Sequence, residues 1–250
     1  MHIFLTNDDG IYAPGLRQLC AMAVHVGHKV TVCAPDRECS AASHSITVFD
    51  PLRAHPLEIE GARAFAVAGR PADCVRLGLT SLIDSPVDVV ISGINRGANE
   101  GLNCAYSGTV GAAVEGAVVG VQSLATSFCS FTNDDYDAPC RMTLKVAAWM
   151  LAHPLPWGVI YNLNTPNLPF EEIKGIKYTS LAPRLYESFG YERRVTPFGR
   201  DYYWIDDRRI EAYEDDCCDA AATMAGYASL TALTWDMTYR GAVDLEGLAL

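Results

Sequence analysis

Two adjacent carboxylates follow the first apolar run of the chain. Residues 3–5 are apolar, as in a buried strand, and Asn7-Asp8-Asp9-Gly10 ends the run abruptly. Adjacent carboxylates repel each other, so a partly enclosed turn tolerates them best when a cation or several N–H donors face them. A metal site is one interpretation, and the other is that Asp8 or Asp9 caps a helix that begins near Gly15. The position favours a ligand site, because ligands collect beyond the carboxyl ends of strands in open α/β sheets.

Two further strand ends offer oxygen atoms of the same kind. Ser40 lies in the polar turn after the apolar run 30–34, and Asn95 lies in the glycine-rich turn after the β-branched run 87–91. Right-handed crossovers bring such turns to one edge of a sheet. Together with the acidic pair they form an all-oxygen set that suits Mg²⁺ or Mn²⁺ better than zinc or copper. A cation held there could polarise a phosphoryl group and lower the pKa of a bound water.

A third feature could bind phosphate. Tyr106-Ser107-Gly108-Thr109 precedes a small-residue helix over 110–119, and either Ser107 or Thr109 could cap it. Free N–H groups and flanking hydroxyls at a helix N-terminus form a natural phosphate cradle. An ordinary capped helix remains the alternative at this point.

The elements that must position these residues follow an alternating β/α pattern. The periodicity predicts a doubly wound, Rossmann-like, mainly parallel sheet in an α/β domain over residues 1–185. Between 44 and 67 we expect a hairpin-like excursion, with alternation at 45–49 and 65–67. The predicted strands lie at 3–5, 30–34, 87–91, 124–128 and 158–163, and the predicted helices at about 16–26, 71–82, 110–119 and 140–151.

The character of the chain changes from about Arg184. Aromatic residues crowd 186–213 with the alternation of a two-stranded ribbon, and a last apolar stretch lies within 220–233. Isolated hairpins are marginal in water, so such a ribbon is more plausible as an arm that contacts another subunit. We therefore expect residues 186–250 to form a C-terminal β-ribbon and helix oligomerisation extension, in a homodimer or homotetramer.

Composition excludes several classes of protein. With 50% hydrophobic residues the chain can bury a sizeable core, and a net charge of −11 argues against binding to duplex nucleic acid. The nine cysteines show no Cys-x-x-Cys pair, which is typical of reduced thiols in a cytoplasmic protein. No apolar run is long enough to span a membrane, and the start lacks the pattern of a signal peptide.

Other chemistries lack their usual motifs. A phosphoaspartate mechanism would use Asp-x-Asp, and Asp8-Asp9 does not present both carboxylates to one side of a strand as easily. The first turn contains no Gly-x-Gly-x-x-Gly for a dinucleotide, and no Gly-x-Ser-x-Gly elbow is present for a serine hydrolase.

These segments resemble the survival protein E (SurE) family of nucleotidases, in order and along nearly the whole chain. The resemblance rests on long and unusual stretches. They are Leu5-Thr-Asn-Asp-Asp-Gly10, Ala34-Pro-Asp-Arg37 with Ser40 and Ser43-His-Ser45, Pro71-Ala-Asp-Cys-Val75, Ser92-Gly-Ile-Asn-Arg-Gly-Ala-Asn99, Tyr106-Ser-Gly-Thr-Val-Gly-Ala-Ala113, Asn162-Leu-Asn164, Thr196-Pro-Phe-Gly199, Tyr203-Trp204 and Gly226-Tyr-Ala-Ser-Leu-Thr231 with Asp236.

The resemblance implies a metal-dependent phosphomonoesterase that acts on nucleoside 5′- and 3′-monophosphates, with short polyphosphate as a possible extra substrate. It implies one divalent ion per subunit, Mg²⁺ or Mn²⁺, with Asp8 and Asp9 as catalytic residues. The implied metal ligands are Asp8, Asp9, Ser40 and Asn95, and the implied phosphate-binding residues are Asn99, Ser107, Gly108 and Thr109. The alternative is a nucleotide-binding or assembly protein of the same fold without turnover.

Three positions depart from the family pattern, and two residues stay ambiguous. Arg70 replaces a Thr that could cap a helix, Ala41 replaces a Gly, and Ala232 replaces a Pro. Ala41 is unfavourable if that position needs positive φ. His44 could bind phosphate or serve as a proton donor, although a hydrogen-bonded loop residue is the commoner case. Arg96 could clamp phosphate or fix its own loop.

Overall fold

The computed structural model describes residues 1–213 and 217–238. Its centre is a nine-stranded sheet of order β3-β4-β2-β1-β5-β6-β7-β13-β8, and two small antiparallel pairs, β10-β11 and β12-β9, lie outside it. The strands are β1 His2–Thr6, β2 Lys29–Pro35, β3 Ala54–Ile59, β4 Ala62–Val67, β5 Val89–Arg96, β6 Gln122–Phe128, β7 Val159–Thr165, β8 Ile176–Tyr178, β9 Tyr186–Ser188, β10 Tyr191–Val195, β11 Asp201–Ile205, β12 Arg208–Arg209 and β13 Ala228–Thr234.

The order of the strands reverses beside β1. The chain runs from β1 outward to β2 and β4, and then returns to place β5 on the other side of β1. The six strands from β4 to β7 in this order are parallel, which confirms the predicted fold class. In such sheets the crevice between the two strands at the reversal binds ligands. The acidic pair lies in the turn that follows β1. Asn95 lies inside β5, near its end, because this strand runs on to Arg96 and not only to the expected residue 91.

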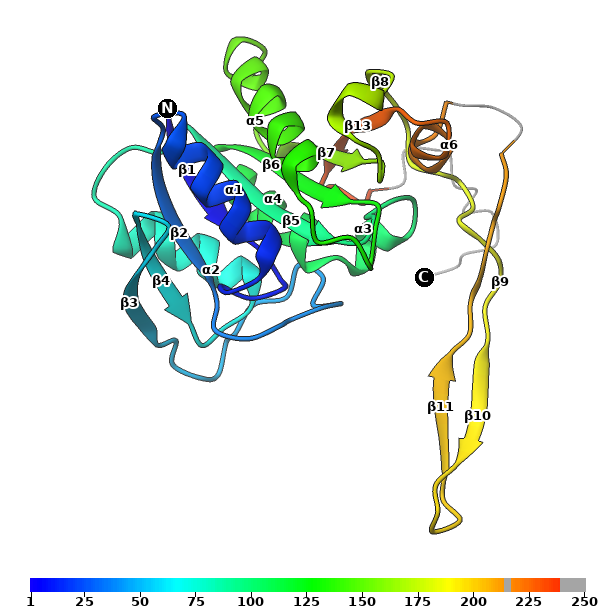
Figure 1. Ribbon diagram of the computed structural model, residues 1–250. Coiled ribbons are helices and arrows are strands. Elements are labelled where there is room, and N and C mark those ends of the chain that lie inside the picture. Colours follow the sequence, from blue (N-terminus) through cyan, green and yellow to red (C-terminus); the bar gives the residue numbers. More distant parts are fainter. Residues whose placement is uncertain (214–216, 239–250) are drawn as a thin grey trace, which may run out of the picture.

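Helices cover both faces of the sheet (Figure 1). One face packs against α1 and α5, and the other packs against α2 and α4. Because strand side chains alternate, Ile3 and Leu5 of β1 join the first cluster and Phe4 joins the second. Burial on both faces explains the continuous apolar runs in the sequence. The helices are α1 Pro14–His25, α2 Pro71–Leu77, the π-helical η1 Gly78–Leu82, α3 Asn103–Tyr106, α4 Gly108–Val119, α5 Asp137–Ala152, the 3₁₀ turn η2 Phe170–Glu172 and α6 Asp219–Met224.

The capping interpretation of the acidic pair is wrong. Helix α1 begins at Pro14, and its N-cap, Ala13, offers no side-chain hydrogen bond. Pro14 tolerates this because it lacks the N–H group that a cap would satisfy. The carboxylates of Asp8 and Asp9 are therefore not used to begin this helix.

The predicted strand at 45–49 is also wrong. The hairpin lies at β3 and β4, and the earlier stretch is a loop. Ser43 ties this loop to the end of α3, because its N–H donates to Tyr106 O at 2.9 Å. Pro56 lies within β3, which is an edge strand where a missing N–H is tolerated.

The C-terminal part of the chain divides between a projecting ribbon and the main sheet. The ribbon β10-β11 projects away from the body (Figure 1), whereas β13 pairs antiparallel with β7 and parallel with β8 inside the main sheet. Residues on both sides of the expected boundary at 185 therefore share one sheet, and the division into 1–185 and 186–250 stays a prediction. Residues 214–216 and 239–250 of the expected extension lie outside the described residues.

Over residues 1–213 and 217–238, no helix has both the length and the apolar composition that a membrane span requires.

A strained position lies in the loop after β2. Ala41 adopts φ 58°, so the position where the family commonly has glycine does need positive φ. A left-handed residue with a Cβ costs about 1–2 kcal/mol. We expect Ala41→Gly to raise the free energy of unfolding by about 0.5–1 kcal/mol in urea denaturation. Ala42→Gly is the matched control, because its φ is ordinary and added backbone freedom should lower stability; equal effects of both variants would contradict this account.

Candidate active site

Hydrogen bonds to backbone carbonyl groups hold the acidic turn after β1. The Asn7 side-chain amide donates to Gly10 O at 2.9 Å, and the Cys39 N–H donates to Asp8 O at 2.7 Å. The second bond joins the turn to the loop after β2. Asp8 is 4% exposed, and its carboxylate accepts a short hydrogen bond from the Thr109 hydroxyl. The turn is thus fixed before any ligand arrives.

The two carboxylates lie in an environment that opposes their charge. Burial raises the pKa of Asp8, although the Thr109 hydroxyl and the N–H groups of Gly108 and Thr109 act in the other direction. Burial and the charge of Asp8 raise the pKa of Asp9 to about 6. In the part of the chain that the structure describes, neither carboxylate forms an ion pair with a lysine or arginine. A bound cation would offset this unfavourable charge.

The end of β5 lies beside the acidic turn. The Arg96 N–H donates to Asp9 Oδ2 at 3.2 Å. Asn95 Nδ2 donates to Gly97 O at 2.8 Å, which directs its amide nitrogen to the loop and leaves its oxygen for a ligand. The Arg96 guanidinium pairs closely with Asp134. This pair joins the loop after β5 to the loop before α5, as the loop-fixing interpretation expects, while Arg96 also lines the cavity that contains Asp8.

The loop after β2 supplies Ser40. Its hydroxyl donates to Glu38 Oε1 at 2.8 Å, and the side chain is exposed. Further along this loop, His44 Nε2 lies 2.8 Å from Glu115 Oε2. Glu115 is 1% exposed and also accepts from Arg76 Nε at 2.6 Å. Burial would raise the pKa of Glu115, but these two partners outweigh it and lower the pKa. His44 is therefore a hydrogen-bonded loop residue.

The N-terminus of α4 faces the acidic turn. Ser107 caps the helix by accepting from the Val110 N–H at 3.1 Å, whereas the Thr109 hydroxyl is used by Asp8. A Cβ added to Gly108 would lie 2.9 Å from both Cβ and Oδ2 of Asp8. Only glycine lets the helix end approach the carboxylate this closely.

The predicted site residues come together at one edge of the sheet. Asp8, Ser40, Asn95, Asn99 and Ser107 line one cavity of about 320 Å³. The other three predicted residues lie next to residues that line this cavity. Gly108 and Thr109 contact Asp8, and Asp9 accepts a hydrogen bond from the Arg96 N–H. None of the eight is placed elsewhere.

The donor set of this cavity fits a hard divalent cation. Two carboxylates, one amide oxygen and one hydroxyl are all oxygen ligands, as Mg²⁺ and Mn²⁺ prefer. No cluster of three or more His, Cys, Asp or Glu that could hold a metal occurs among the described residues. A cation here would depend on Asn95 and Ser40 as well as on the acidic pair.

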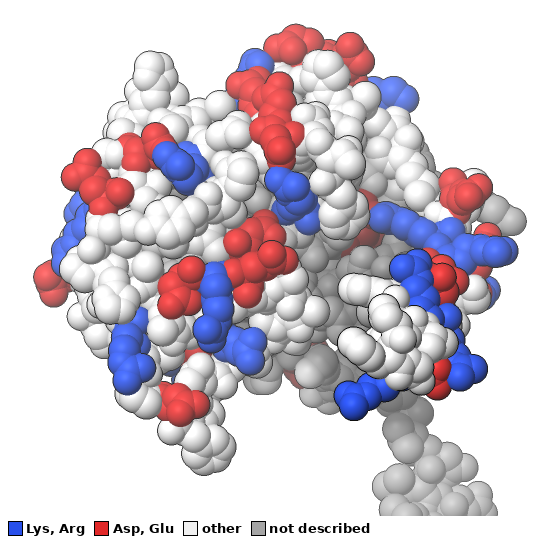
Figure 2. Space-filling view, turned by 60° about the horizontal axis from the view of Figure 1, so that its bottom comes forward, with Lys and Arg blue, Asp and Glu red and all other residues white. Residues whose placement is uncertain are grey.

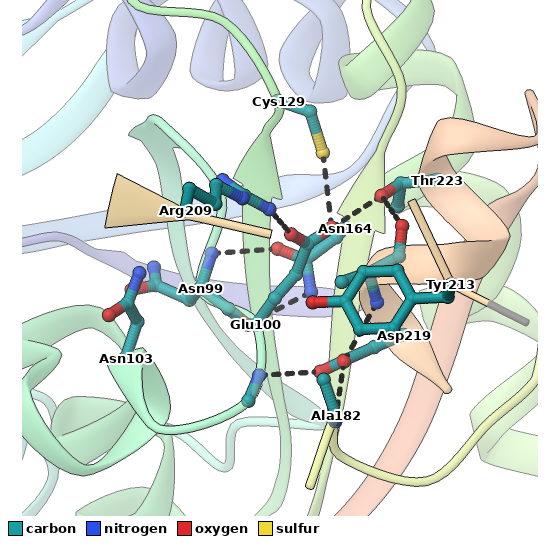
Figure 3. A network of polar contacts seen from close by, with 12 residues as sticks. Asn99, Glu100, Asn103, Cys129, Asn164, Ala182, Arg209, Tyr213, Asp219 and Thr223 are labelled. Atoms are coloured by element: carbon teal, nitrogen blue, oxygen red, sulfur yellow. Dashed lines mark hydrogen bonds and ion pairs between the residues drawn. The ribbon is translucent and has the colours of Figure 1, made fainter. Parts of the chain in front are cut away.

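Two asparagines of β7 position Asn99. The Asn99 N–H donates to Asn164 Oδ1 at 2.8 Å, and Asn99 O accepts from Asn162 at 2.9 Å and from Asn164 at 3.0 Å (Figure 3). Asn99 Nδ2 donates to Ser127 Oγ of β6 at 2.8 Å. The polar end of β7 thus lies at the same edge of the sheet as the cavity, and its two asparagines hold Asn99 in place.

Sequence reasoning missed a second polar network beside Asn99. Glu100 is fully buried, accepts from Thr223 Oγ1 at 2.5 Å, and pairs closely with Arg209 (Figure 3). The buried Asp219 carboxylate accepts from the Gly101 N–H at 2.9 Å. These contacts join β12 and α6 to the loop that carries Asn99. Nothing local in the sequence pairs residues more than 100 positions apart, so no signal could have found them.

Comparison with known proteins identifies relatives of this chain. A family model described as survival protein SurE matches residues 3–188. A 5′-nucleotidase SurE of Synechococcus sp. is 43% identical over 98% of this chain and 95% of its own length. A 5′-nucleotidase SurE of Symbiobacterium thermophilum is 42% identical over 97% of this chain and 95% of its own length.

A solved structure gives the same assignment. The crystal structure of the SurE protein from Aquifex aeolicus matches with a TM-score of 0.83 and 34% identity, and it covers 95% of both chains. Because the family model and the relatives agree over nearly the whole length, the chain belongs to the survival protein SurE family.

Proposed function

We propose that this protein is a divalent-metal-dependent phosphomonoesterase that hydrolyses nucleoside 5′-monophosphates, and 3′-monophosphates, to nucleoside and inorganic phosphate. The relatives named 5′-nucleotidase support the substrate class. The terminal group of short polyphosphate presents the same chemistry, so an exopolyphosphatase side activity belongs to the same proposal. Buried thiols such as Cys20, Cys74 and Cys140 suit a reducing cytoplasm.

One observation carries the proposal: two adjacent, enclosed carboxylates lie beside a helix N-terminus, and within residues 1–213 and 217–238 neither of them forms an ion pair with a lysine or arginine. Such a pair is unfavourable in the empty protein and becomes favourable when a divalent cation binds. The phosphate of a substrate would then meet a locally positive site inside an acidic protein.

Each residue has a role that its contacts support. Asp8, Asp9, Ser40 and Asn95 would hold one Mg²⁺ or Mn²⁺ ion, which when bound supplies electrophilic activation of the phosphoryl group and of water. Ser107 and Asn99 line the same cavity and would bind phosphate oxygens. Gly108 leaves room for the helix N–H groups, and Thr109 orients Asp8 through its hydroxyl. Thr109 thus acts as a positioning residue as well as a phosphate neighbour.

We further propose that the projecting ribbon contacts another subunit, in a homodimer or homotetramer. Every residue of β10 and β11 is exposed, including Tyr191, Tyr203 and Trp204. Basic side chains gather over the ribbon (Figure 2), where Arg193 and Arg194 pair with neighbouring carboxylates at 2.8 and 2.7 Å. Exposed aromatic rings between paired charges are typical of a protein interface.

The metal prediction compares two variants in phosphate release from AMP as Mn²⁺ is raised. Asn95→Asp adds a negative charge that opposes the incoming phosphate dianion, so kcat/KM should fall at least ~10-fold, about 1.4 kcal/mol. The metal midpoint, which is the Mn²⁺ concentration that gives half of the maximal activity, should stay unchanged or fall. Asp8→Asn removes a charged ligand, so its midpoint should move to higher Mn²⁺. A thermal shift with Mn²⁺ alone reports the same order of affinities without turnover.

Chelation provides the control for this prediction. The wild-type protein should release no phosphate in EDTA and should recover when Mn²⁺ is restored. Wild-type turnover and an unchanged midpoint in Asn95→Asp would remove Asn95 from the metal site. No release from any nucleotide, with or without Mn²⁺, would favour a binding protein without turnover.

The glycine prediction tests the approach of α4 to Asp8. Gly108→Ala would place a Cβ against the Asp8 side chain and displace it, so kcat/KM should fall at least ~10-fold. Gly120→Ala at the other end of the same helix is the control. Its φ is 103° but its added Cβ meets nothing within 4 Å, so it should lower the melting temperature and leave kcat/KM unchanged. Parallel losses of activity in the two variants would point to stability instead.

The ribbon prediction concerns assembly. Replacing residues 191–205 by Asn-Gly should leave the main sheet intact, because Gly190 O already accepts from the Asp206 N–H at 2.9 Å. We expect the mass measured by light scattering to fall below that of the full-length protein at equal concentration. If both proteins have the same subunit number, the ribbon does not hold the subunits together.

A further inference from the structure

A second cavity adjoins the candidate active site. Its volume is about 520 Å³, within the range of about 300–1,000 Å³ typical of small-molecule sites. It shares two lining residues, Ala98 and Phe131, with the cavity that contains Asp8 and Asn95. The two hollows are therefore neighbours with a common wall, and a molecule that places its phosphate in one can extend into the other.

Phe131 dominates the common wall. Its ring lies directly against Gly97, because a Cβ added to Gly97 would be 2.5 Å from two ring carbons. The side chain is nevertheless 71% exposed, so much of its surface stays available to a ligand. An exposed aromatic face beside a phosphate site is the kind of surface on which a nucleobase stacks.

The floor of the second cavity is polar but carries balanced charge. Glu100 and Arg209 both line it, and they neutralise each other in a close ion pair (Figure 3). Arg209 is the only lysine or arginine among its described lining residues. A second phosphate would find no unpaired cation here, whereas an uncharged group would not be repelled.

One accessible donor points to the kind of uncharged ligand. Arg209 Nε has no hydrogen-bond partner within the described chain, but it is itself buried, so the donor that a ligand in the cavity can reach is the exposed side-chain amide of Asn167. Asn167 Oδ1 accepts from Asn133 Nδ2 at 2.8 Å. The Asn167 amide nitrogen points away from Asn133 and can donate to a ligand. Asn167 and Arg209 both line the cavity. Ring nitrogens, keto oxygens and ribose oxygens are the acceptors that such donors need.

We infer that the cavity between Phe131 and Arg209 binds the nucleoside part of the substrate, with the base stacked on Phe131. This inference rests on the proposed function and names where its substrate is recognised. It makes Phe131 a specificity-determining residue, which contacts the base and leaves the phosphoryl chemistry to the acidic pair.

The test compares AMP with methyl β-ribofuranoside 5-phosphate, which has the same phosphate ester and sugar but no base. In Phe131→Ala, kcat/KM for AMP should fall about tenfold, mainly through KM, whereas kcat/KM for the base-free ester should change less than about twofold. Phe131→Tyr keeps the ring and should retain the preference for AMP. Leu151→Ala, an exposed apolar residue at the far end of α5, is the control and should change neither value.

Binding of adenosine by calorimetry separates this inference from the proposed function. Wild-type protein should bind adenosine, and Phe131→Ala should bind it about tenfold more weakly. If neither ester is hydrolysed but adenosine binding still depends on Phe131, the hydrolase proposal fails and the nucleoside site stands. If kcat/KM for the two esters falls by the same factor in Phe131→Ala, the nucleoside site is wrong. It is also wrong if adenosine binds equally to the wild-type and variant proteins, or binds to neither.

Discussion

The arrangement of this protein depends on keeping two adjacent carboxylates enclosed at the end of β1. Their mutual repulsion and lost hydration oppose folding unless nearby groups compensate. The N-terminus of α4 provides the main compensation, with the Thr109 hydroxyl and two backbone N–H groups directed at Asp8. Gly108 makes that approach possible. The position of α4, and with it the cavity, follows from this one electrostatic requirement.

The remaining contacts hold the other walls of the cavity at a fixed distance from the acidic pair. Backbone hydrogen bonds tie the loop after β2 to the turn after β1, and three side chains of β6 and β7 hold Asn99. The Glu100 and Asp219 contacts extend this support to β12 and α6. The site is therefore built from nearly the full length of the chain, although the residues that we propose as metal ligands lie in or next to short turns at the ends of strands.

Much of this could be predicted from the sequence, for a physical reason. Buried parallel strands need continuous apolar runs, and the polar residues that follow them must lie at one edge, so Asp8, Ser40 and Asn95 could be brought together without a structure. The helix cap at Ser107 was also predictable, because such caps act over three residues.

The failures share a cause, which is that long-range packing overrides local pattern. The stretch 45–49 alternates like a strand, but hydrogen bonds from Ser43 to the end of α3 hold it as a loop. The Glu100–Arg209 pair and the place of β13 depend on residues distant in sequence. The helical period around Leu16 was correct, yet it could not show that Pro14 removes the need for an acidic cap.

The interior position of β13 has a consequence for synthesis on the ribosome. Strands β1 to β7 can associate once residue 165 has emerged, but β7 then presents an unpaired edge until residues 228–234 follow. Open edges of this kind are templates for pairing with other chains. The open edge of β7 is closed only after the whole ribbon has been made, so the completed sheet requires a strand that lies beyond the ribbon in the sequence.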